Sequence, residues 1–318
     1  MGELSHMGKI AYMFPGQGAQ SVGMGADAYE QHPGAAAWFR EADEVLGYAL
    51  SDLIFRGPEE ELKLTYHTQP ALLTTSCAYL RMLAESGVQP DYVAGHSLGE
   101  YSALVCAGVI TFRDAVHTVR KRGEFMDQAV PAGQGSMAAV LGAEREALAE
   151  LCAKVSAETG AVEMANVNCP GQIVVSGTVQ GVQAIIGKGK EIGAKRVIPL
   201  EVSGPFHSSL MKPAAEQLEE VLANIELHDA KVPVIANVTA RPVTNADEIR
   251  RLLVDQVVSP VLWEDSIRLL LSLGVDTFVE IGPGAILSGL VRKIDRSANV
   301  ITVNSCDSLR AAVETFQG

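Results

Sequence analysis

Ser97 lies in Gly95-His96-Ser97-Leu98-Gly99, which has the pattern Gly-x-Ser-x-Gly. A short apolar run precedes this pattern, and a helical pattern follows it. A serine in a tight strand-to-helix turn holds its hydroxyl at the top of a sheet, where the helix N-terminus offers free N–H groups to an oxyanion. The two glycines leave room where strand, turn and helix crowd together. The same pattern occurs by chance in flexible loops, but its context here favours a nucleophile.

A nucleophilic serine needs a general base, and His207 is the candidate. It ends the run Ser203–His207 at a junction between two differently patterned regions, where catalytic groups often cluster. The alternative is that His207 merely begins the following helix. No acid stands between Ser97 and His207 in a matching loop, although α/β-hydrolases run serine, acid, histidine. Asp255 and Gln256 come later, and either could orient His207 through a side chain or a backbone carbonyl. His96 is expected to point away from Ser97.

Arg122 falls on the inward face of a predicted amphipathic helix over 112–129. The apolar stripe of that helix steps by three or four residues through Phe112, Ala115, Val119, position 122 and Met126. An arginine on a buried face needs an anion, because an unpaired buried charge is very costly. Two interpretations remain open: a structural salt bridge, or a bidentate clamp for a substrate carboxylate.

Gln17 lies in a glycine-rich turn after the first predicted strand, over 10–14. Such a turn can approach the top of the Ser97 strand, so Gln17 could contribute to an oxyanion hole. The chain contains neither a phosphate-binding G-x-x-x-x-G-K-[ST] motif nor a G-x-G-x-x-G motif. The five scattered cysteines form no C-x-x-C pair, and the seven histidines show no H-x-x-x-H spacing. We therefore predict reduced thiols, no metal and no cofactor.

The 318-residue chain has a net charge of −13, which argues against nucleic-acid binding. No apolar run reaches the roughly 18 residues of a membrane span, and the N-terminus lacks the apolar region of a secretory signal. We therefore expect a cytoplasmic protein that does not associate with a membrane. An acidic protein that handles an anionic substrate must concentrate positive charge locally. Two clusters do so, although either could be ordinary solvated surface: Lys188, Lys190, Lys195 and Arg196, and Arg292, Lys293 and Arg296.

The pattern of elements predicts an α/β fold made of two domains. Residues 9–132 and 204–318 are expected to form an α/β-hydrolase-like large domain with a mostly parallel sheet. Residues 133–203 are expected to form an inserted ferredoxin-like domain in the order βαββαβ. Residues 1–8 are left out of this reasoning. The predicted helices lie at 36–46, 68–86 (with Pro70 in its first turn), 112–129, 144–158, 179–192, 209–224, 247–257, 263–273 and 285–294. The predicted strands lie at 10–14, 91–94, 137–141, 162–167, 173–176, 196–202, 232–237 and 275–281.

Six motifs together resemble the malonyl-CoA:acyl-carrier-protein transacylases, the acyltransferase family of type II fatty-acid synthesis. The resemblance runs from about Lys9 along essentially the whole chain. The motifs are Phe14-Pro15-Gly16-Gln17-Gly18-Ala19-Gln20, Gly95 to Ala103, Arg122-Gly123 with Met126, Asn166 to Gln172, Gly204-Pro205-Phe206-His207, and Glu280-Ile281-Gly282-Pro283-Gly284.

The resemblance implies a malonyl transfer from malonyl-CoA to acyl carrier protein through Ser97, with His207 as base. It assigns Arg122 to the malonyl carboxylate, and Gln17 with the Leu98 N–H to the oxyanion hole. It also implies that a backbone carbonyl of the Asp255-Gln256 region orients His207. Leu98 and Phe206 favour malonyl over methylmalonyl. The other expected substrate contacts are Met126, Asn166 and Gln172.

The two basic clusters are expected to serve the two anionic substrates. Lys195 and Arg196 would bind the phosphates of CoA or pantetheine. Arg292, Lys293 and Arg296 would bind the acidic carrier protein. The alternatives are a serine thioesterase, an acyltransferase of a polyketide pathway, and a non-catalytic protein that keeps the fold.

Overall fold

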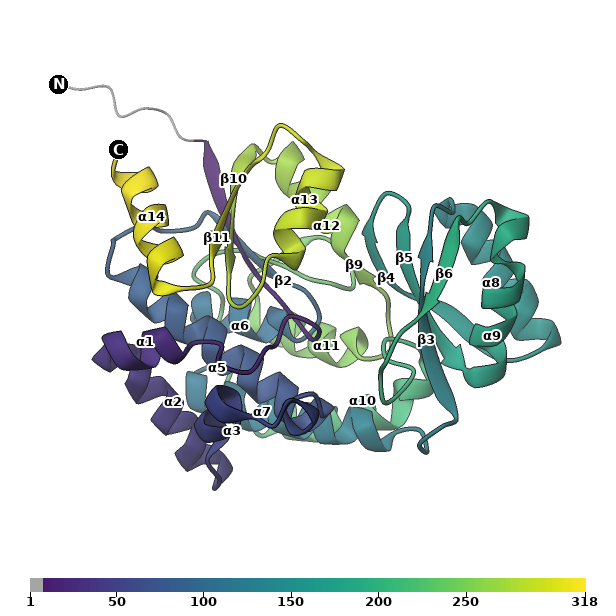
Figure 1. Ribbon diagram of the computed structural model, residues 1–318, viewed down its shortest axis with the longest axis horizontal. Helices are drawn as coiled ribbons and strands as arrows, with labels where there is room; N and C mark the ends of the chain where they lie inside the picture. The colour runs from purple at the N-terminus through teal and green to yellow at the C-terminus, as the bar shows by residue number, and fades with distance from the viewer. Residues whose placement is uncertain (1–7) are drawn as a thin grey trace.

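The computed structural model describes residues 8–318, so residues 1–7, which were set aside above, lie outside it. The fold is mixed α/β and contains two sheets (Figure 1). The first sheet has the order β11-β10-β1-β2-β7-β8, and every neighbouring pair is parallel except β7 and β8. Its strands are β1 (Lys9–Phe14), β2 (Tyr92–Gly95), β7 (Val234–Ile235), β8 (Pro242–Val243), β10 (Val275–Ile281) and β11 (Asn299–Val303).

The second sheet has the order β6-β3-β5-β4-β9 and lies to the right of the first in Figure 1. The chain passes through it as strand, helix, strand, strand, helix, strand, as predicted. Its fifth strand, β9, comes from beyond residue 203 and pairs parallel with β4. Its elements are β3 (Gly135–Leu141), α8 (Arg145–Glu158), β4 (Val162–Cys169), β5 (Gln172–Thr178), α9 (Val179–Lys188), the 3₁₀ helix η1 (Gly189–Ile192), β6 (Arg196–Pro199) and β9 (Val261–Leu262).

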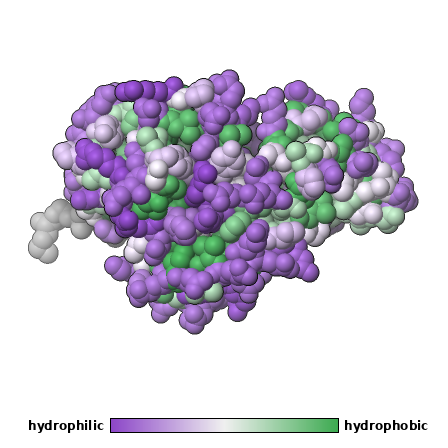
Figure 2. All heavy atoms as spheres, turned by 90° about the horizontal axis from the view of Figure 1, so that it is seen from below, coloured by the Kyte–Doolittle hydropathy of each residue, from purple (hydrophilic) through white to green (hydrophobic). Residues whose placement is uncertain are grey.

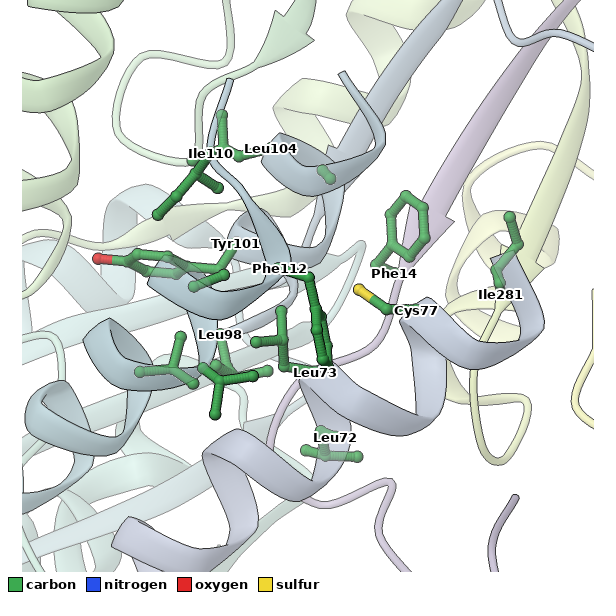
Figure 3. Close-up of a cluster of buried hydrophobic side chains, with 14 of the residues drawn as sticks. Phe14, Leu72, Leu73, Cys77, Leu98, Tyr101, Leu104, Ile110, Phe112 and Ile281 are labelled. Atoms are coloured by element: carbon green, nitrogen blue, oxygen red, sulfur yellow. The ribbon is translucent and has the colours of Figure 1, made fainter. Parts of the chain in front are cut away.

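The remaining helices pack mostly around the first sheet, and α5 is buried along most of its length. Figure 3 shows Leu72 and Leu73 of α5 in the same buried hydrophobic cluster as Leu98, which precedes α6, and Tyr101, which lies in α6. The helices are α1 (Ala26–Gln31), α2 (Pro33–Leu46), α3 (Leu50–Arg56), α4 (Glu59–Leu62), α5 (Thr65–Ala84), α6 (Gly99–Cys106), α7 (Phe112–Gln128), the 3₁₀ helix η2 (Ser209–Met211), α10 (Lys212–Ala223), α11 (Ala246–Gln256), α12 (Trp263–Ser272), α13 (Ile286–Ile294) and α14 (Cys306–Gln317).

One predicted boundary is wrong for an identifiable reason. Helix α5 begins at Thr65, so Pro70 lies in its second turn rather than its first. Proline has no N–H, and it therefore cannot bond the carbonyl four residues earlier, at Tyr66. Nη1 of Arg120 donates to that carbonyl instead, at 3.1 Å. A contact from another helix thus satisfies the group that proline leaves free.

Strand β6 also ends earlier than predicted, at Pro199 instead of Val202. Residues 200–203 leave the sheet, and Leu200 and Val202 then line a cavity. Polar side chains cover most of the face seen in Figure 2, with smaller hydrophobic areas between them. Across the part of the chain that the structure covers, no helix has both the length and the apolar character needed to span a bilayer.

The turn after β2 is crowded, as the two glycines predicted. A Cβ at position 95 would collide with the carbonyl oxygen of Gly99. A Cβ at position 99 would collide with the carbonyl oxygen of Phe14 in the neighbouring strand β1. Backbone atoms at such positions cannot rotate away, so the turn accepts no side chain at either place.

We expect Gly95→Ala to lower the free energy of unfolding by about 2 kcal/mol or more, because overpacking against backbone forces the turn to shift. Thermal or urea unfolding measures this effect. Gly187→Ala is the matched control: it lies in α9 with open space around it, so alanine should be neutral or stabilising by up to about 1 kcal/mol. Equal stability of Gly95→Ala and wild type would contradict the crowded turn.

Candidate active site

Ser97 stands between β2 and α6 with a φ of 54°, in the left-handed region that non-glycine residues rarely adopt. Such a conformation costs about 1–3 kcal/mol and persists only where neighbours enforce it. The side chain of Asn237 spans the turn: Oδ1 accepts from the Ser97 N–H at 2.8 Å, and Nδ2 donates to the Gly95 carbonyl at 2.7 Å. Asn237 therefore holds the backbone on both sides of the serine.

The structure brings Ser97 and His207 together across 110 residues of sequence. The Ser97 Oγ lies 2.6 Å from Nε2 of His207. Nδ1 of His207 lies 2.9 Å from the backbone carbonyl oxygen of Gln256, which can only accept, so the proton sits on Nδ1 and Nε2 is free to accept. Asp255 is exposed, and the Gln256 carbonyl orients the ring. This geometry is the one that a nucleophilic serine and its general base require.

Arg122 is buried, with 1% of its surface exposed, as its place on the apolar stripe predicted. It donates to Oε1 of Gln69 at 2.7 Å, to Oε1 of Gln256 at 2.9 Å and to the Ser97 Oγ at 3.2 Å. Its guanidinium also lies 5.6 Å from the centre of the Tyr101 ring. Within residues 8–318 no carboxylate forms a salt bridge with it, and its Nε has no hydrogen-bond partner. Burial lowers the pKa of Arg122.

These contacts decide between the two interpretations of Arg122 left open by the sequence. All three acceptors are neutral oxygens, so they fix the direction of the guanidinium without compensating its charge. A structural salt bridge is therefore not what holds it. A buried cation beside Ser97 that no carboxylate of residues 8–318 contacts directly could receive an anionic ligand.

A cavity of about 210 Å³ opens in front of Ser97, between the two sheets. The predicted contact residues Gln17, Leu98, Met126, Asn166, Gln172 and Phe206 all line it, together with Arg122 and His207. Several lining residues had no sequence signal, because they come from unrelated segments: Val174, Leu200, Val202, Ile286, Leu287 and Leu290. Ile286 is half exposed, which places it at the opening.

Two backbone N–H groups near Ser97 have no acceptor in the structure as described, those of Leu98 and Gln17. Leu98 precedes the first residue of α6, where helix N–H groups are free. The Gln17 side chain has one long contact, 3.4 Å from its Nε2 to Oγ1 of Thr65. The site therefore offers donors on the two segments from which the oxyanion hole was expected.

His96 points away from the nucleophile, as predicted. Its Nε2 lies 2.8 Å from Oδ1 of Asn168, and its ring packs against Trp263. Sequence reasoning missed Asn168, Asn237 and Gln69. Asn168 lies inside a quoted motif, but the other two are single amides in segments without chemical pattern, so only the fold identifies them.

The two basic clusters predicted from the sequence do not line this cavity. Lys195 and Arg196 are exposed on or next to β6, the edge strand of the second sheet, and the structure does not bring them to the lining. Arg292, Lys293 and Arg296 are exposed at or just after the end of α13, the helix whose first residues line the opening. Among residues 8–318, no cluster of histidine, cysteine, aspartate or glutamate could hold a metal ion.

The pH dependence of Ser97 reactivity tests this geometry. Burial, and after it the charge of Arg122, lower the pKa of His207 from 6.5 to about 3. The base works when neutral, so we expect the rate of Ser97 inactivation by a sulfonyl fluoride to stay level from about pH 8 to about pH 5. In Arg122→Ala one of the two causes is lost, and the rate should fall toward the acid end of that range.

Arg113→Ala is the control for this experiment, because Arg113 lies on the same helix but is exposed and faces Glu41 and Glu44. It should keep the level profile of the wild type. A wild-type rate that titrates near pH 6.5, the ordinary value for histidine, would contradict the arrangement.

Comparison with known proteins gives one consistent result. The family model for the acyl transferase domain matches residues 11–313. The malonyl CoA-acyl carrier protein transacylase of Bacillus subtilis (strain 168) is 57% identical over 311 residues, covering 98% of this chain and 98% of that protein. A crystal structure of an acyl carrier protein S-malonyltransferase from Vibrio cholerae is 46% identical with a TM-score of 0.93, covering 96% of this chain and 99% of its own. A malonyl-transacylase solved in complex with a type II PKS acyl-carrier protein is 44% identical with a TM-score of 0.94, over 96% and 99% of the two chains. The chain therefore belongs to the acyl transferase domain family.

Proposed function

We propose that this protein transfers the malonyl group from malonyl-CoA to the phosphopantetheine thiol of acyl carrier protein. The observation that carries the proposal is the buried Arg122 guanidinium, 3.2 Å from the Ser97 Oγ and held by neutral oxygens only. An acyl group that ends in a carboxylate supplies the missing anion when its thioester carbon lies at Ser97. Relatives that are 57% and 46% identical bear the name of this activity.

The first half-reaction forms a malonyl-serine ester. His207 Nε2 takes the proton of the Ser97 hydroxyl as the oxygen attacks the thioester carbonyl. The oxyanion of the tetrahedral intermediate is held by the N–H groups of Leu98 and Gln17. The C–S bond then breaks, and the coenzyme A sulfur leaves with the proton from His207.

The second half-reaction reverses these steps with a different thiol. His207 takes the proton of the phosphopantetheine thiol, whose sulfur attacks the ester carbon. The Ser97 oxygen leaves and recovers the proton. The malonyl carboxylate stays on Arg122 throughout, which keeps the ester oriented for the incoming thiol. The reaction balances without an added cofactor, so we propose that none is used.

The other lining residues complete the proposed substrate site. Phe206 and Leu98 narrow the cavity around the acyl group, and this favours malonyl over its methylated homologue. Met126 lines the cavity one helical turn after Arg122 on α7, and the amides of Asn166 and Gln172 would offer polar contacts to the thioester arm. A thioesterase would share Ser97 and His207, but its hydrolysis of a thioester would not require the uncompensated Arg122 cation in the acyl pocket. A non-catalytic relative would not need the short contact between Ser97 and His207.

We also infer that the chain forms two domains with different roles at the active site. Residues 9–132 and 204–318 would form an α/β-hydrolase-like domain that carries Ser97 and His207, and residues 133–203 a ferredoxin-like domain that closes the cavity. The parallel order of the first sheet and the strand order β6-β3-β5-β4 support this inference. The five free cysteines suit the reducing cytoplasm, where we propose that the protein acts in fatty-acid synthesis.

Two surface sites would receive the anionic substrates. Arg292, Lys293 and Arg296 lie at the far end of the helix that opens the cavity, and we propose that they dock the acidic carrier protein. Lys195 and Arg196 would attract the phosphates of coenzyme A, although they lie outside the cavity.

Arg292→Glu with Lys293→Glu should raise the KM for carrier protein, most at low ionic strength, and leave self-malonylation near wild type. Loss of self-malonylation alone would show the docking surface to be misplaced.

Labelled malonyl-CoA tests the proposed function. The wild type should become labelled on Ser97 and pass the label to added carrier protein. Ser97→Ala should bind no label, because it lacks the nucleophile while keeping the fold. Release of label as free malonate, with none on the carrier protein, would identify a thioesterase. Absence of label on the wild type would overturn covalent transfer altogether.

Arg122→Ala tests the role of the cation. Malonyl transfer should fall by about 100-fold or more, since a bidentate charged contact exceeds the roughly 1.5–3 kcal/mol of a single charged hydrogen bond. Acetyl transfer should be spared or improved, because an acetyl group leaves no carboxylate unpaired. Comparing kcat/KM for malonyl-CoA and acetyl-CoA measures the difference. An equal loss for both substrates would make Arg122 a purely structural residue.

A further inference from the structure

Glu100 is a buried carboxyl group that the mechanism above does not use. It lies in α6, three residues after the nucleophile, with 4% of its surface exposed and outside the lining of the cavity. Its Oε1 accepts from the backbone N–H of Asn237 at 2.9 Å, and its Oε2 accepts from Nε2 of Gln256 at 2.8 Å. Across residues 8–318 no lysine, arginine or histidine forms a salt bridge with it. Both oxygens face donors, which is the pattern of an ionised carboxylate. Burial raises the pKa of Glu100 to about 7, so the group is mostly ionised at pH 8.

Gln256 is the residue through which Glu100 reaches the active site. The side-chain oxygen of Gln256 accepts from Nη2 of Arg122 at 2.9 Å. Its Nε2 faces three acceptors: the Glu100 Oε2, the Ser97 carbonyl at 3.0 Å and the Asn237 Oδ1 at 3.2 Å. Only one of these acceptors carries a charge, and charge-assisted hydrogen bonds are the stronger kind.

The orientation of the Gln256 amide decides the direction of Arg122. If the amide turned over, its NH₂ group would face the guanidinium, donor against donor, and its oxygen would face Glu100 and the Ser97 carbonyl. Arg122 would then lose one of the two amide oxygens that hold it, leaving Gln69 alone. Glu100 makes the turned-over form unfavourable, because a carboxylate repels the amide oxygen.

We propose that Glu100 is a positioning residue that sets the preference for a carboxylated acyl group, acting through the Gln256 amide on Arg122. The inference rests on the proposed function. The Glu100 carboxylate supplies a negative charge that is separated from the Arg122 guanidinium by the side chain of Gln256. It fixes the direction of Arg122 while the neutral Gln256 oxygen stands between them, so the cation stays available to the substrate. A glutamine at position 100 could not do this, because its NH₂ would have to face either Asn237 N–H or the Gln256 amide.

The test compares kcat/KM for acylation by malonyl-CoA and by acetyl-CoA at pH 8, in wild type and Glu100→Gln. We expect the malonyl-to-acetyl ratio to fall about tenfold in the variant, through the malonyl value, as for a lost charged hydrogen bond. The ratio does not depend on the fraction of enzyme that is folded, so a destabilised variant still gives an answer. Glu280→Gln is the control: Glu280 is equally buried but accepts only from Leu287 and Ser288, so that variant should lose stability and keep the ratio.

A second variant separates positioning from a general effect on the fold. Gln256→Leu removes the amide but keeps the backbone carbonyl that orients His207, and it should lower the ratio as Glu100→Gln does. The double variant should then be no worse than Gln256→Leu, since Glu100 acts through that amide. Additive losses, or an unchanged ratio in Glu100→Gln, would overturn the inference while leaving the proposed function intact. A wild type that forms no malonyl-serine would overturn both.

Discussion

The uncompensated charge of Arg122 is the constraint on which the rest of the active site depends. Placing a guanidinium inside a protein costs several kcal/mol unless an anion accompanies it. Here no counter-ion is in direct contact: the protein provides hydrogen bonds from Gln69 of α5 and Gln256 of α11, and a cation–π contact from the Tyr101 ring of α6. The partial compensation keeps the side chain in one place. Because the charge of Arg122 is not fully compensated, the folded protein is less stable than it would be with a counter-ion. An anionic ligand would supply the missing interaction.

The same cation shapes the chemistry at Ser97. With burial it depresses the pKa of His207, which keeps the base neutral, and it donates to the oxygen that attacks. A bound carboxylate would offset this charge and make His207 a stronger base once the substrate is present. In the proposed mechanism, substrate recognition and activation of Ser97 would therefore be linked through Arg122. Gln256 contacts Arg122 through its amide oxygen and His207 through its backbone carbonyl.

Local spacing predicted the features that depend on neighbours in sequence. The crowded turn around Ser97 and the inward direction of Arg122 follow from periodicity and from glycine positions alone. His207 was assigned with the help of a resemblance. Gln69, Asn237 and the buried partners of Glu100 could not be predicted, because their roles arise from contacts between distant segments. The strands β8 and β9 have two residues each, too few to show an alternating pattern. The start of α5 was predicted wrongly from Pro70. The donor that satisfies the carbonyl left free by this proline, Arg120, lies 50 residues away in the sequence and could not be foreseen.

The short strand β9 has a mechanical consequence. It pairs through backbone bonds with β4 at Asn166, while the N–H of Leu262 donates to the carbonyl of Asn237, whose side chain clamps the nucleophile turn. Arg145 and Asp265 add an ion pair between α8 and α12 nearby. These bonds join the two sheets next to Ser97, so any movement of one sheet against the other would have to break backbone hydrogen bonds beside the turn that carries the serine.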